Sequence, residues 1–535
     1  MRRPFLLIAL VVASFLIFRS LPAGLASAYL DPVGRIIAQD EALYASTSIH
    51  MAQSGDWLTP MFLNRPALYK PPLLPWLAAA SVKLFGISRT PLRLPAAILC
   101  GLAAGLIFLW IAELASWQCA LCGVALLAAS RLFTIAGAAC LTDGLLVAFF
   151  IAAMYALFSD PWLESRAAFW TFAGAVAASV LTKSIAGILP LIVLVLYSVT
   201  APSKYKPALS RVALVALAAA ALVAPWYAWQ FATHPRWFWT DHFLVEIFGY
   251  GTGAPPQTSN ENRFAFYLLR LPLTDPVLVA LALAGVPAFF AALRKRTPEA
   301  SLLACWIIVV LASVFGWSYR NLTYLLPLFP ALAIVAMAYG PFAKMTPAWW
   351  MFPLTAAAIG LKFIAPLSPW GIPTAPSHVP AAPSLTAYCE LHRGNGLLIV
   401  DPDDELFAAD LPLPRIRYVW RGEPPQPGRY ALDFADMGIT LSVAQFDDLP
   451  KLRPAFRRKL REWGVDADPI GTVIYYSDPA QIASLVAAHP DSDFLLPHDA
   501  APASTHVLVN APDGQVLMLS RDPKPAPAPA WTCNP

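Results

Sequence analysis

Long apolar runs separated by short polar connections occupy roughly the first 366 residues of the chain. A run of about 17–22 apolar residues is long enough to cross the hydrocarbon layer of a membrane as one helix. Such runs lie at roughly 4–20, 92–113, 118–136, 144–160, 167–182, 185–201, 210–229, 276–293, 301–317, 322–339 and 348–366. The pattern predicts an all-α polytopic membrane domain with about 11–13 transmembrane helices and further helices at the interface.

The stretch "LLPWLAAASVKLF" at 73–85 is apolar, but it is short for a span and contains Lys83. We therefore predict a helix that lies at the membrane interface. With this choice the N-terminus and the basic clusters "SKYK" and "RKR" fall inside the cell, as the positive-inside rule requires, and the C-terminus lies outside. The choice leaves Arg89 and Arg93 on the outer side. The first run follows "MRR" without a small-residue cleavage site, which predicts an uncleaved anchor.

The last third of the chain has the composition of a soluble α/β domain. The runs "LLIVD", "RIRYVW", "TVIYY" and "HVLVN" predict short strands, and helices are expected near 452–463 and 479–489. A Pro-rich stretch before them predicts a linker. The predicted organisation is a membrane domain at 1–366 with long outer loops at about 21–91 and 230–275, a linker at 367–384 and an α/β domain at 385–535 outside the cytoplasm.

Composition narrows the class of protein. Hydrophobic residues make up 58% of the chain and charged residues only 13%, which excludes an ordinary soluble protein. The net charge of +4 comes from scattered Lys and Arg, so no nucleic-acid partner is expected. Cys119 and Cys122 form a lone C-x-x-C in an apolar run, where packing is the favoured interpretation. Cys389 and Cys533 could form a disulfide outside the cytoplasm or remain two thiols. No residues have metal-ligand spacing, and no cofactor is expected.

The acidic pair in "QDEALYASTSIHMAQSG" lies just beyond the first apolar run. If this stretch is helical, Asp40 and Tyr44 lie on one side, whereas Glu41 is turned about 100° away from Asp40. A carboxylate near lipid contacts less water, which raises its basicity and suits a general base that takes a proton from a hydroxyl. The alternative is a solvated helix start, where acids favour the N-terminal end of the helix dipole.

A cation precedes two prolines in "LYKPPLLPWL". Pro71 and Pro72 disfavour helix at Lys70 and hold its backbone extended. A cation held there, at the entrance to an interfacial helix, could bind a phosphate. The alternative is a lysine that extends toward lipid headgroups.

Further charged residues lie at the outer ends of predicted spans. Asp143 begins one span, where it is either a functional group or a helix cap. Lys183 follows at an outer turn, and Arg320 precedes Tyr324 by four residues at another outer end. A planar guanidinium suits phosphate binding. Under the predicted topology these residues share one side of the membrane with Asp40 and Lys70, as expected of a site for an anionic lipid and a hydroxyl.

These motifs resemble a known family. "DEALYASTSIHMAQSGDWLTP", "LYKPPLLPWL", "FGISRTPLRLPAA", "LTKSIAGILP" and "YLLPLFPALA" are similar to motifs of the polytopic C-type glycosyltransferases, in particular the bacterial aminoarabinose transferases of lipid A, which are related to protein O-mannosyltransferases. The resemblance covers roughly residues 30–340 in the same order and does not extend to the C-terminal domain.

The resemblance implies transfer of a sugar, with inversion, from a polyprenyl-phosphate donor to a hydroxyl or phosphate of an envelope acceptor such as lipid A or another glycan. It makes Asp40 the general base and Lys70 a ligand of the donor phosphate, with Asp143 organising the site. It implies that Arg320, which stands where the family often has Lys, stabilises the phosphate charge and that Tyr324 lines the donor site. We also predict substrate-binding positions at Glu41, Tyr44, Lys70 and Lys183, with Glu41 supporting its helix or the neighbouring elements. The resemblance also implies a multi-pass protein of the bacterial inner membrane, in contact with membrane lipids, with its site and C-terminal domain in the periplasm.

The sequence departs from the family at four positions. Leu43 stands where an Arg is common, Tyr69 replaces an acid before "KPP", and Ser46 and His50 replace acids in the first helix. These departures concern the identity of the sugar and acceptor more than the reaction.

Other functions remain open from the sequence. The acceptor could be a protein Ser or Thr, as in protein O-mannosyltransferases. A transporter or flippase for lipid-linked sugars would also be polytopic, but it should show inverted repeats and helices interrupted near mid-membrane. A non-catalytic scaffold would keep its function without Asp40.

Overall fold

The computed structural model describes two parts of the chain. In the membrane region these are residues 39–62, 65–86, 89–249, 262–344 and 353. In the C-terminal region they are residues 388, 391, 395–400, 416–421, 431–434, 439–442, 473–476, 478, 480–498, 501, 507–510 and 515–520. Several predicted features lie outside the described residues: the span at 4–20, that at 348–366 apart from Pro353, the linker at 367–384, the helix near 452–463 and the cysteines at 389 and 533.

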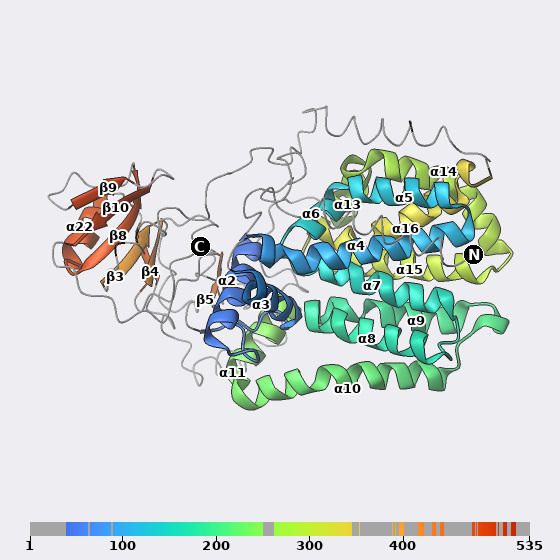
Figure 1. Ribbon diagram of the computed structural model, residues 1–535, viewed down its shortest axis with the longest axis horizontal. Coiled ribbons are helices and arrows are strands. Elements are labelled where there is room, and N and C mark those ends of the chain that lie inside the picture. The colour runs from blue at the N-terminus through green and yellow to red at the C-terminus, as the bar shows by residue number, and fades with distance from the viewer. Residues whose placement is uncertain are drawn as a thin grey trace.

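Helices dominate the described membrane region (Figure 1). The α-helices are α2 (Gln39–Ser54), α3 (Leu73–Phe85), α4 (Arg89–Leu114), α5 (Trp117–Ala129), α6 (Arg131–Ala138), α7 (Thr142–Ser159), α8 (Arg166–Lys183), α9 (Leu189–Thr200), α10 (Leu209–Thr233), α11 (Pro235–Phe238), α13 (Arg263–Thr274), α14 (Pro276–Arg294), α15 (Pro298–Gly316) and α16 (Leu328–Ile334). Shorter 3₁₀ turns are η1 (Ser184–Ile188), η2 (Ser203–Tyr205), η4 (Leu322–Leu325) and η6 (Pro341–Lys344), and π-helical segments are η3 (Trp239–Gly249) and η5 (Val335–Tyr339).

Seven apolar helical stretches in the described residues are long enough to cross a membrane. One of them, Arg166–Thr200, contains two predicted spans, because the chain reverses at η1. Gly187 approaches the backbone of Ser179 so closely that a Cβ atom there would lie 2.2 Å from the carbonyl carbon of Ser179. The turn therefore requires glycine. Together these stretches make the chain a multi-pass membrane protein.

The predicted single span at 118–136 is wrong. The structure has two helices there, α5 and α6, which are interrupted at Ser130 with an extended backbone. The Ser130 hydroxyl donates a 2.7 Å hydrogen bond to the buried carboxylate of Asp275, between α13 and α14. A contact between distant segments thus accompanies the break, which falls at the polar residues Ser130 and Arg131 of an otherwise mostly apolar run.

Aromatic side chains fill the core of the helical bundle. The Trp110 ring of α4 stacks on Phe158 of α7 with centroids 4.4 Å apart, and Trp306 of α15 lies 5.3 Å from Phe150 of α7. At the start of α7, a Cβ atom on Gly144 would lie 2.1 Å from the carbonyl oxygen of Ala136 in α6. The beginning of α7 is therefore packed tightly against α6.

The two predicted outer loops contain helices. The helix predicted at 73–85 is confirmed as α3, although its place at a membrane interface remains a prediction. A short hairpin, β1 (Met61–Phe62) and β2 (Arg65–Pro66), connects α2 to α3. Figure 1 shows α2 and α3 beside one end of the long helices α4, α7 and α8. This end of the bundle contains the candidate site.

The C-terminal region contains a six-stranded mixed sheet with the order β7-β4-β3-β8-β10-β9. Its strands are β3 (Gly396–Val400), β4 (Ile416–Arg421), β7 (Val473–Tyr476), β8 (Ser492–Pro497), β9 (Val507–Asn510) and β10 (Gln515–Leu519), while β5 (Ala431–Phe434) and β6 (Ile439–Ser442) pair separately. The strands β7, β4, β3 and β8 are parallel, and β10 is antiparallel to both β8 and β9. Helix α22 (Ala480–Ala488) packs Ile482 and Val486 against the sheet. The four predicted strands and the helix near 479–489 are confirmed.

Candidate active site

Asp40 lies in the first turn of α2, where acidic side chains favour the positive end of the helix dipole. Its side chain is exposed, yet protein atoms surround it closely enough that desolvation dominates its titration. Desolvation by these surrounding atoms raises the pKa of the Asp40 carboxyl above its ordinary value, against the opposing effects of Lys70 and Lys183. The result is a carboxylate that is open to a ligand and more basic than an ordinary aspartate.

Glu41, the next residue, points to a different environment. It is 1% exposed and accepts two hydrogen bonds from the Arg93 guanidinium of α4, 2.8 Å at Oε1 and 3.0 Å at Oε2. The backbone N–H of Cys140 donates a third bond of 2.8 Å to Oε1. Glu41 therefore links the start of α2 to α4 and to the turn before Asp143. This geometry supports a structural role for Glu41, whereas direct substrate binding by Glu41 stays a prediction.

The same pair explains why Arg93 lies where the predicted topology disfavours a cation. Arg93 is 1% exposed, and its charge is compensated inside the protein by Glu41. A buried, bidentate arginine gives no information on the orientation of the nearest loop.

We expect the variant Glu41→Gln to lower the free energy of unfolding by about 3–5 kcal/mol, because it leaves the Arg93 charge buried without a carboxylate. The measurement is thermal unfolding of the purified protein in detergent. The double variant Glu41→Gln, Arg93→Met should recover part of the loss, because it removes the stranded charge. A melting temperature equal to that of the wild type for Glu41→Gln would contradict a structural role for the pair.

Lys70 follows the β1–β2 hairpin and precedes Pro71 and Pro72. Its ammonium group forms an ion pair with the Glu246 carboxylate of η3, and the two side chains are 15% and 19% exposed. Burial, and next the charge of Lys183, lower the pKa of Lys70 to about 7, while Asp40 and Asp143 oppose this shift. The direct contact with Glu246 also favours the ammonium form. Lys70 is therefore a largely desolvated cation with a carboxylate partner.

The second cation is Lys183, the last residue of α8. Its ammonium group donates a 2.7 Å hydrogen bond to Oδ1 of Asp143, in the first turn of α7. It also lies 5.3 Å from the centroid of the Tyr324 ring in η4, a cation–π distance. Three predicted site residues from separate elements thus meet at one point.

The two cations belong to one group of charges. Asp40, Lys70, Asp143 and Lys183 influence one another electrostatically, which requires them to lie near each other at the same end of the bundle. Burial and the Asp40 charge also raise the pKa of Tyr319, so the segment before η4 approaches the same group. The arrangement combines two lysines with a more basic carboxylate, which suits binding of a phosphate beside a proton acceptor.

Two other predicted residues lie in the surroundings of this group. Tyr44 is buried one turn along α2 from Asp40. Arg320 contacts the Phe266 ring of α13, with its guanidinium carbon 6.0 Å from the ring centroid. Roles for Tyr44 and Arg320 in donor binding stay predictions.

Sequence reasoning missed Glu246 and His242. Both lie in η3, inside the stretch 230–275 that the sequence predicts only as a long outer loop. The available signal was a cluster of ionisable residues in "WTDHFLVEIF" within a loop that is otherwise apolar and aromatic. Their partners Lys70 and Leu68 are more than 170 residues away in the chain, so no local pattern connects them.

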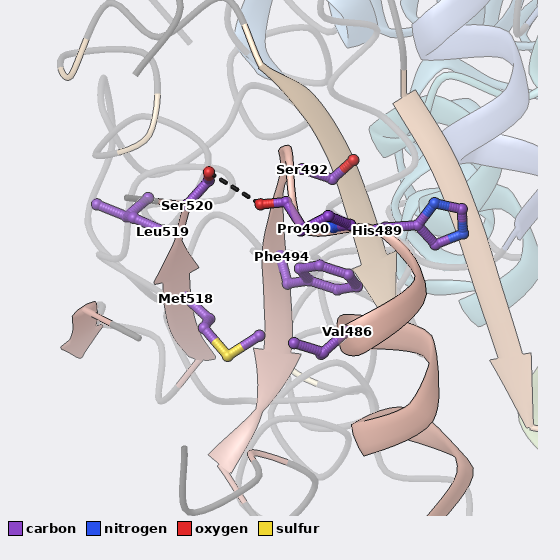
Figure 2. A pocket seen from close by; sticks show the side chains of 8 residues that line it. All are labelled: Val486, His489, Pro490, Ser492, Phe494, Met518, Leu519 and Ser520. Atoms are coloured by element: carbon purple, nitrogen blue, oxygen red, sulfur yellow. Dashed lines mark hydrogen bonds between the residues drawn. The ribbon is translucent and has the colours of Figure 1, made fainter. Parts of the chain in front are cut away.

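Two other kinds of site could compete in the described part of the chain: a metal cluster and the pocket of the C-terminal sheet. Within the described ranges, no three His, Cys, Asp or Glu side chains are grouped to hold a metal ion. The pocket in Figure 2 is small, and the Ser520 hydroxyl at its rim donates a 3.0 Å bond to the Pro490 carbonyl. It is lined by Val486, His489, Pro490, Ser492, Phe494, Met518, Leu519 and Ser520. His489 is the one ionisable side chain in that lining, and a single titratable group does not supply both a proton acceptor and a phosphate-binding cation.

Comparison with known proteins gives matches in both sequence and fold. Residues 69–229 match the family of dolichyl-phosphate-mannose-protein mannosyltransferases. The undecaprenyl phosphate-alpha-4-amino-4-deoxy-L-arabinose arabinosyl transferase of Aeromonas salmonicida is 31% identical over 329 residues, which are 58% of this chain and 57% of that protein. The corresponding transferase 1 of Sodalis glossinidius is 29% identical over 58% of this chain and 56% of its own. The matched region thus spans little more than half of these relatives.

The fold extends further than the sequence match. The crystal structure of ArnT from Cupriavidus metallidurans bound to undecaprenyl phosphate superposes with a TM-score of 0.66, covering 97% of this chain and 98% of that one at 17% identity. The apo form of the same protein gives a TM-score of 0.64 over 96% of this chain and 97% of its own, at 18% identity. The chain is thus similar in sequence to arabinosyl transferases over 58% of its length, and it shares the fold of ArnT over nearly its whole length.

Proposed function

We propose that this chain is an inverting glycosyltransferase that moves a sugar from a polyprenyl-phosphate donor to a hydroxyl or phosphate of an envelope acceptor such as lipid A. The observation that carries the proposal is the group of Lys70 and Lys183 beside the basic carboxylate of Asp40. The undecaprenyl phosphate in the structural relative supports a lipid phosphate as the ligand of such a group.

The two lysines would bind and stabilise the donor phosphate. A glycosyl phosphodiester carries one negative charge, and the leaving phosphate monoester carries more as the sugar departs. Cations fixed in a partly desolvated site stabilise this developing charge more than the ground state, which lowers the barrier. Because Lys70 already contacts Glu246, phosphate binding would replace one anion by another at the same ammonium group.

Asp40 would act as the general base. With a hydroxyl acceptor, the oxygen attacks the anomeric carbon, its proton passes to the Asp40 carboxylate, and the bond from the anomeric carbon to the phosphate oxygen breaks with its electron pair on the phosphate. An ionised phosphate acceptor would attack in the same way without giving up a proton. Attack opposite the leaving group inverts the anomeric centre. The raised pKa of Asp40 makes it a better proton acceptor than a fully solvated aspartate.

The location follows from this chemistry and the predicted topology. We place the protein in the bacterial inner membrane, with the site and the C-terminal domain on the periplasmic side, where lipid-linked sugars meet envelope acceptors. The predicted distribution of basic loops supports this orientation. In this proposal residues 1–366 form the membrane domain, 367–384 the linker and 385–535 the periplasmic domain.

A second acceptor class has its own support. The family matched at residues 69–229 is described as acting on protein, so a Ser or Thr hydroxyl is the alternative acceptor. The donor chemistry and the role of Asp40 would be the same for both acceptors.

The test is mass spectrometry of envelope lipids, glycans and proteins from wild-type cells, cells that lack the protein, and cells complemented with it. Loss of a sugar-sized mass in the deletion and its return on complementation would establish transfer and identify the acceptor. If the deletion loses no modified lipid, glycan or protein, the result would argue against the transferase proposal and favour a transporter of lipid-linked sugars.

The variant Glu246→Gln is expected to strengthen binding of the lipid phosphate by about tenfold, equivalent to ~1.4 kcal/mol, because it removes the anion that competes for Lys70. The measurement is inhibition of the purified enzyme by undecaprenyl phosphate. Glu164→Gln is the matched control, because Glu164 is an exposed acid one helix length from Lys183. Weaker inhibition of Glu246→Gln would show that Glu246 assists the phosphate site instead.

A further inference from the structure

Both backbone polar groups of Leu68 are held by consecutive residues of η3. The Leu68 N–H donates a 3.1 Å hydrogen bond to the Asp241 carboxylate, and its carbonyl oxygen lies 3.3 Å from Nδ1 of His242. Leu68 and His242 are fully buried, and Asp241 is 4% exposed. Because buried backbone groups are costly to leave unpaired, this two-point contact fixes the chain at Leu68.

The hydrogen-bond partners determine the state of the His242 ring. A carbonyl oxygen can only accept, so Nδ1 carries the hydrogen, and Nε2 is the acceptor in the neutral ring. The hydroxyls of Ser184 and Tyr227 lie 2.9 Å and 3.0 Å from Nε2. Burial lowers the pKa of His242 to about 4, so the ring is neutral in the physiological range.

Aromatic side chains enclose the ring and prevent it from rotating away. Phe238 stacks on it with centroids 5.0 Å apart, and Tyr227 meets it edge to face at 5.3 Å. Leu68, Trp226 and Phe238 form the centre of this cluster. A ring packed in this way has one orientation, so its two nitrogen atoms act at fixed positions.

The two ends of the imidazole reach the two segments that carry the cations. Leu68, bound at Nδ1, precedes Lys70 by two residues, and Ser184, at Nε2, directly follows Lys183. Ser184 has φ = 49°, a conformation that is unfavourable for a residue other than glycine and that needs support from its surroundings. A single side chain thus joins the backbone after the hairpin to the end of α8.

We propose that His242 is a positioning residue that sets the spacing between Lys70 and Lys183 in the donor phosphate site. The ligand assignment rests on the proposed function, but the mechanical link between the two segments does not. Loss of the link would displace both cations relative to one phosphate, while Asp40 and the ion pair of Glu41 with Arg93 would remain in place. The effect should therefore fall on the lipid phosphate rather than on the acceptor.

The test compares His242→Phe, which keeps a ring but removes both nitrogen atoms, with His242→Asn, whose amide can still donate toward Leu68. His234→Phe is the matched control. His234 bonds the Thr59 hydroxyl at 3.3 Å through Nε2, and the structure gives it no contact with Leu68 or Ser184 among the described hydrogen bonds. Ser184→Ala, a smaller change at the other end of the ring, is the second variant. The purified full chain in detergent is titrated with undecaprenyl phosphate, and thermal unfolding verifies folding.

We expect His242→Phe to weaken undecaprenyl phosphate binding by about 10- to 100-fold, with the acceptor KM unchanged. Binding by His242→Asn and Ser184→Ala should be intermediate, and His234→Phe should bind as the wild type does. Hydrogen exchange in His242→Phe should become faster around residues 67–70 and 183–186. Wild-type affinity in folded His242→Phe, or in Ser184→Ala if the first variant does not fold, would overturn the proposal. Wild-type protein that binds the lipid phosphate but transfers no sugar would count against the proposed function alone.

Discussion

Replacing Asp40 with Asn is expected to lower kcat by about 10²- to 10⁴-fold, while binding of the lipid phosphate stays close to that of the wild type. The side chain keeps its shape but can no longer accept the proton of the acceptor. The measurement is steady-state transfer by purified enzyme, together with titration by undecaprenyl phosphate. A loss confined to KM would mean that Asp40 binds substrate and that another group is the base.

The pH dependence of the transfer rate is a second measurement of the role of Asp40 as general base. A general base works only when deprotonated, and the pKa of Asp40 is raised by burial. The rate should therefore fall with acidification at a higher pH than for a solvated aspartate, and Asp40→Asn should lose this acid limb. Glu164→Gln serves as the control for removal of an exposed carboxylate and should leave both rate and pH profile unchanged.

Replacing Lys70 with Met is expected to weaken donor binding by about 2–5 kcal/mol, roughly 30-fold to several thousand-fold, because a desolvated cation would be lost from the phosphate. Lys83→Met, on the exposed part of α3, is the control for loss of a nearby lysine. Donor affinity measured with undecaprenyl phosphate should separate the two variants clearly. Equal affinities would remove Lys70 from the phosphate site.

The pKa of Lys70 also leads us to expect that donor kcat/KM falls at high pH. Burial lowers its pKa to about 7, and only the protonated ammonium attracts a phosphate. Donor kcat/KM in the free enzyme should therefore fall as the pH rises through about 7 or somewhat above, since the contact with Glu246 favours the charged form. Lys70→Arg should abolish this fall, because a guanidinium stays charged. A wild-type profile that remains flat through pH 9 would contradict the assignment.

The apolar pattern predicted most helices of the membrane region because burial in lipid or protein imposes it on every span. The predicted ranges 144–160 and 167–182, for instance, correspond to α7 and α8 within two residues. The pattern failed at Ser130, where the interruption accompanies a hydrogen bond to Asp275, 145 residues away. A hydrogen bond between such distant residues does not change the spacing of apolar residues along the sequence.

The candidate site was predictable only in part, for the same reason. Asp143 and Lys183 were recognised as charges at the ends of spans, and the structure joins them in one hydrogen bond. Arg93 was interpreted as a topological anomaly because its partner Glu41 lies 52 residues earlier. Glu246 was missed because a carboxylate in a long loop has no distinguishing pattern until its lysine is known.

The anchoring of the site has a consequence for how the enzyme could work through a catalytic cycle. Asp40 and Asp143 lie at the starts of α2 and α7. These helix ends are held by the buried pair of Glu41 with Arg93 and by the close approach of Gly144 to α6. The Lys70 ammonium group is paired with Glu246 instead, and in the proposed function an incoming phosphate would take the place of this carboxylate. Under the proposed function, donor loading and product release would exchange counter-ions at both ammonium groups, at Lys70 against Glu246 and at Lys183 against Asp143. The proposed base would stay where it is, and turnover would depend on how well the phosphate competes with these carboxylates.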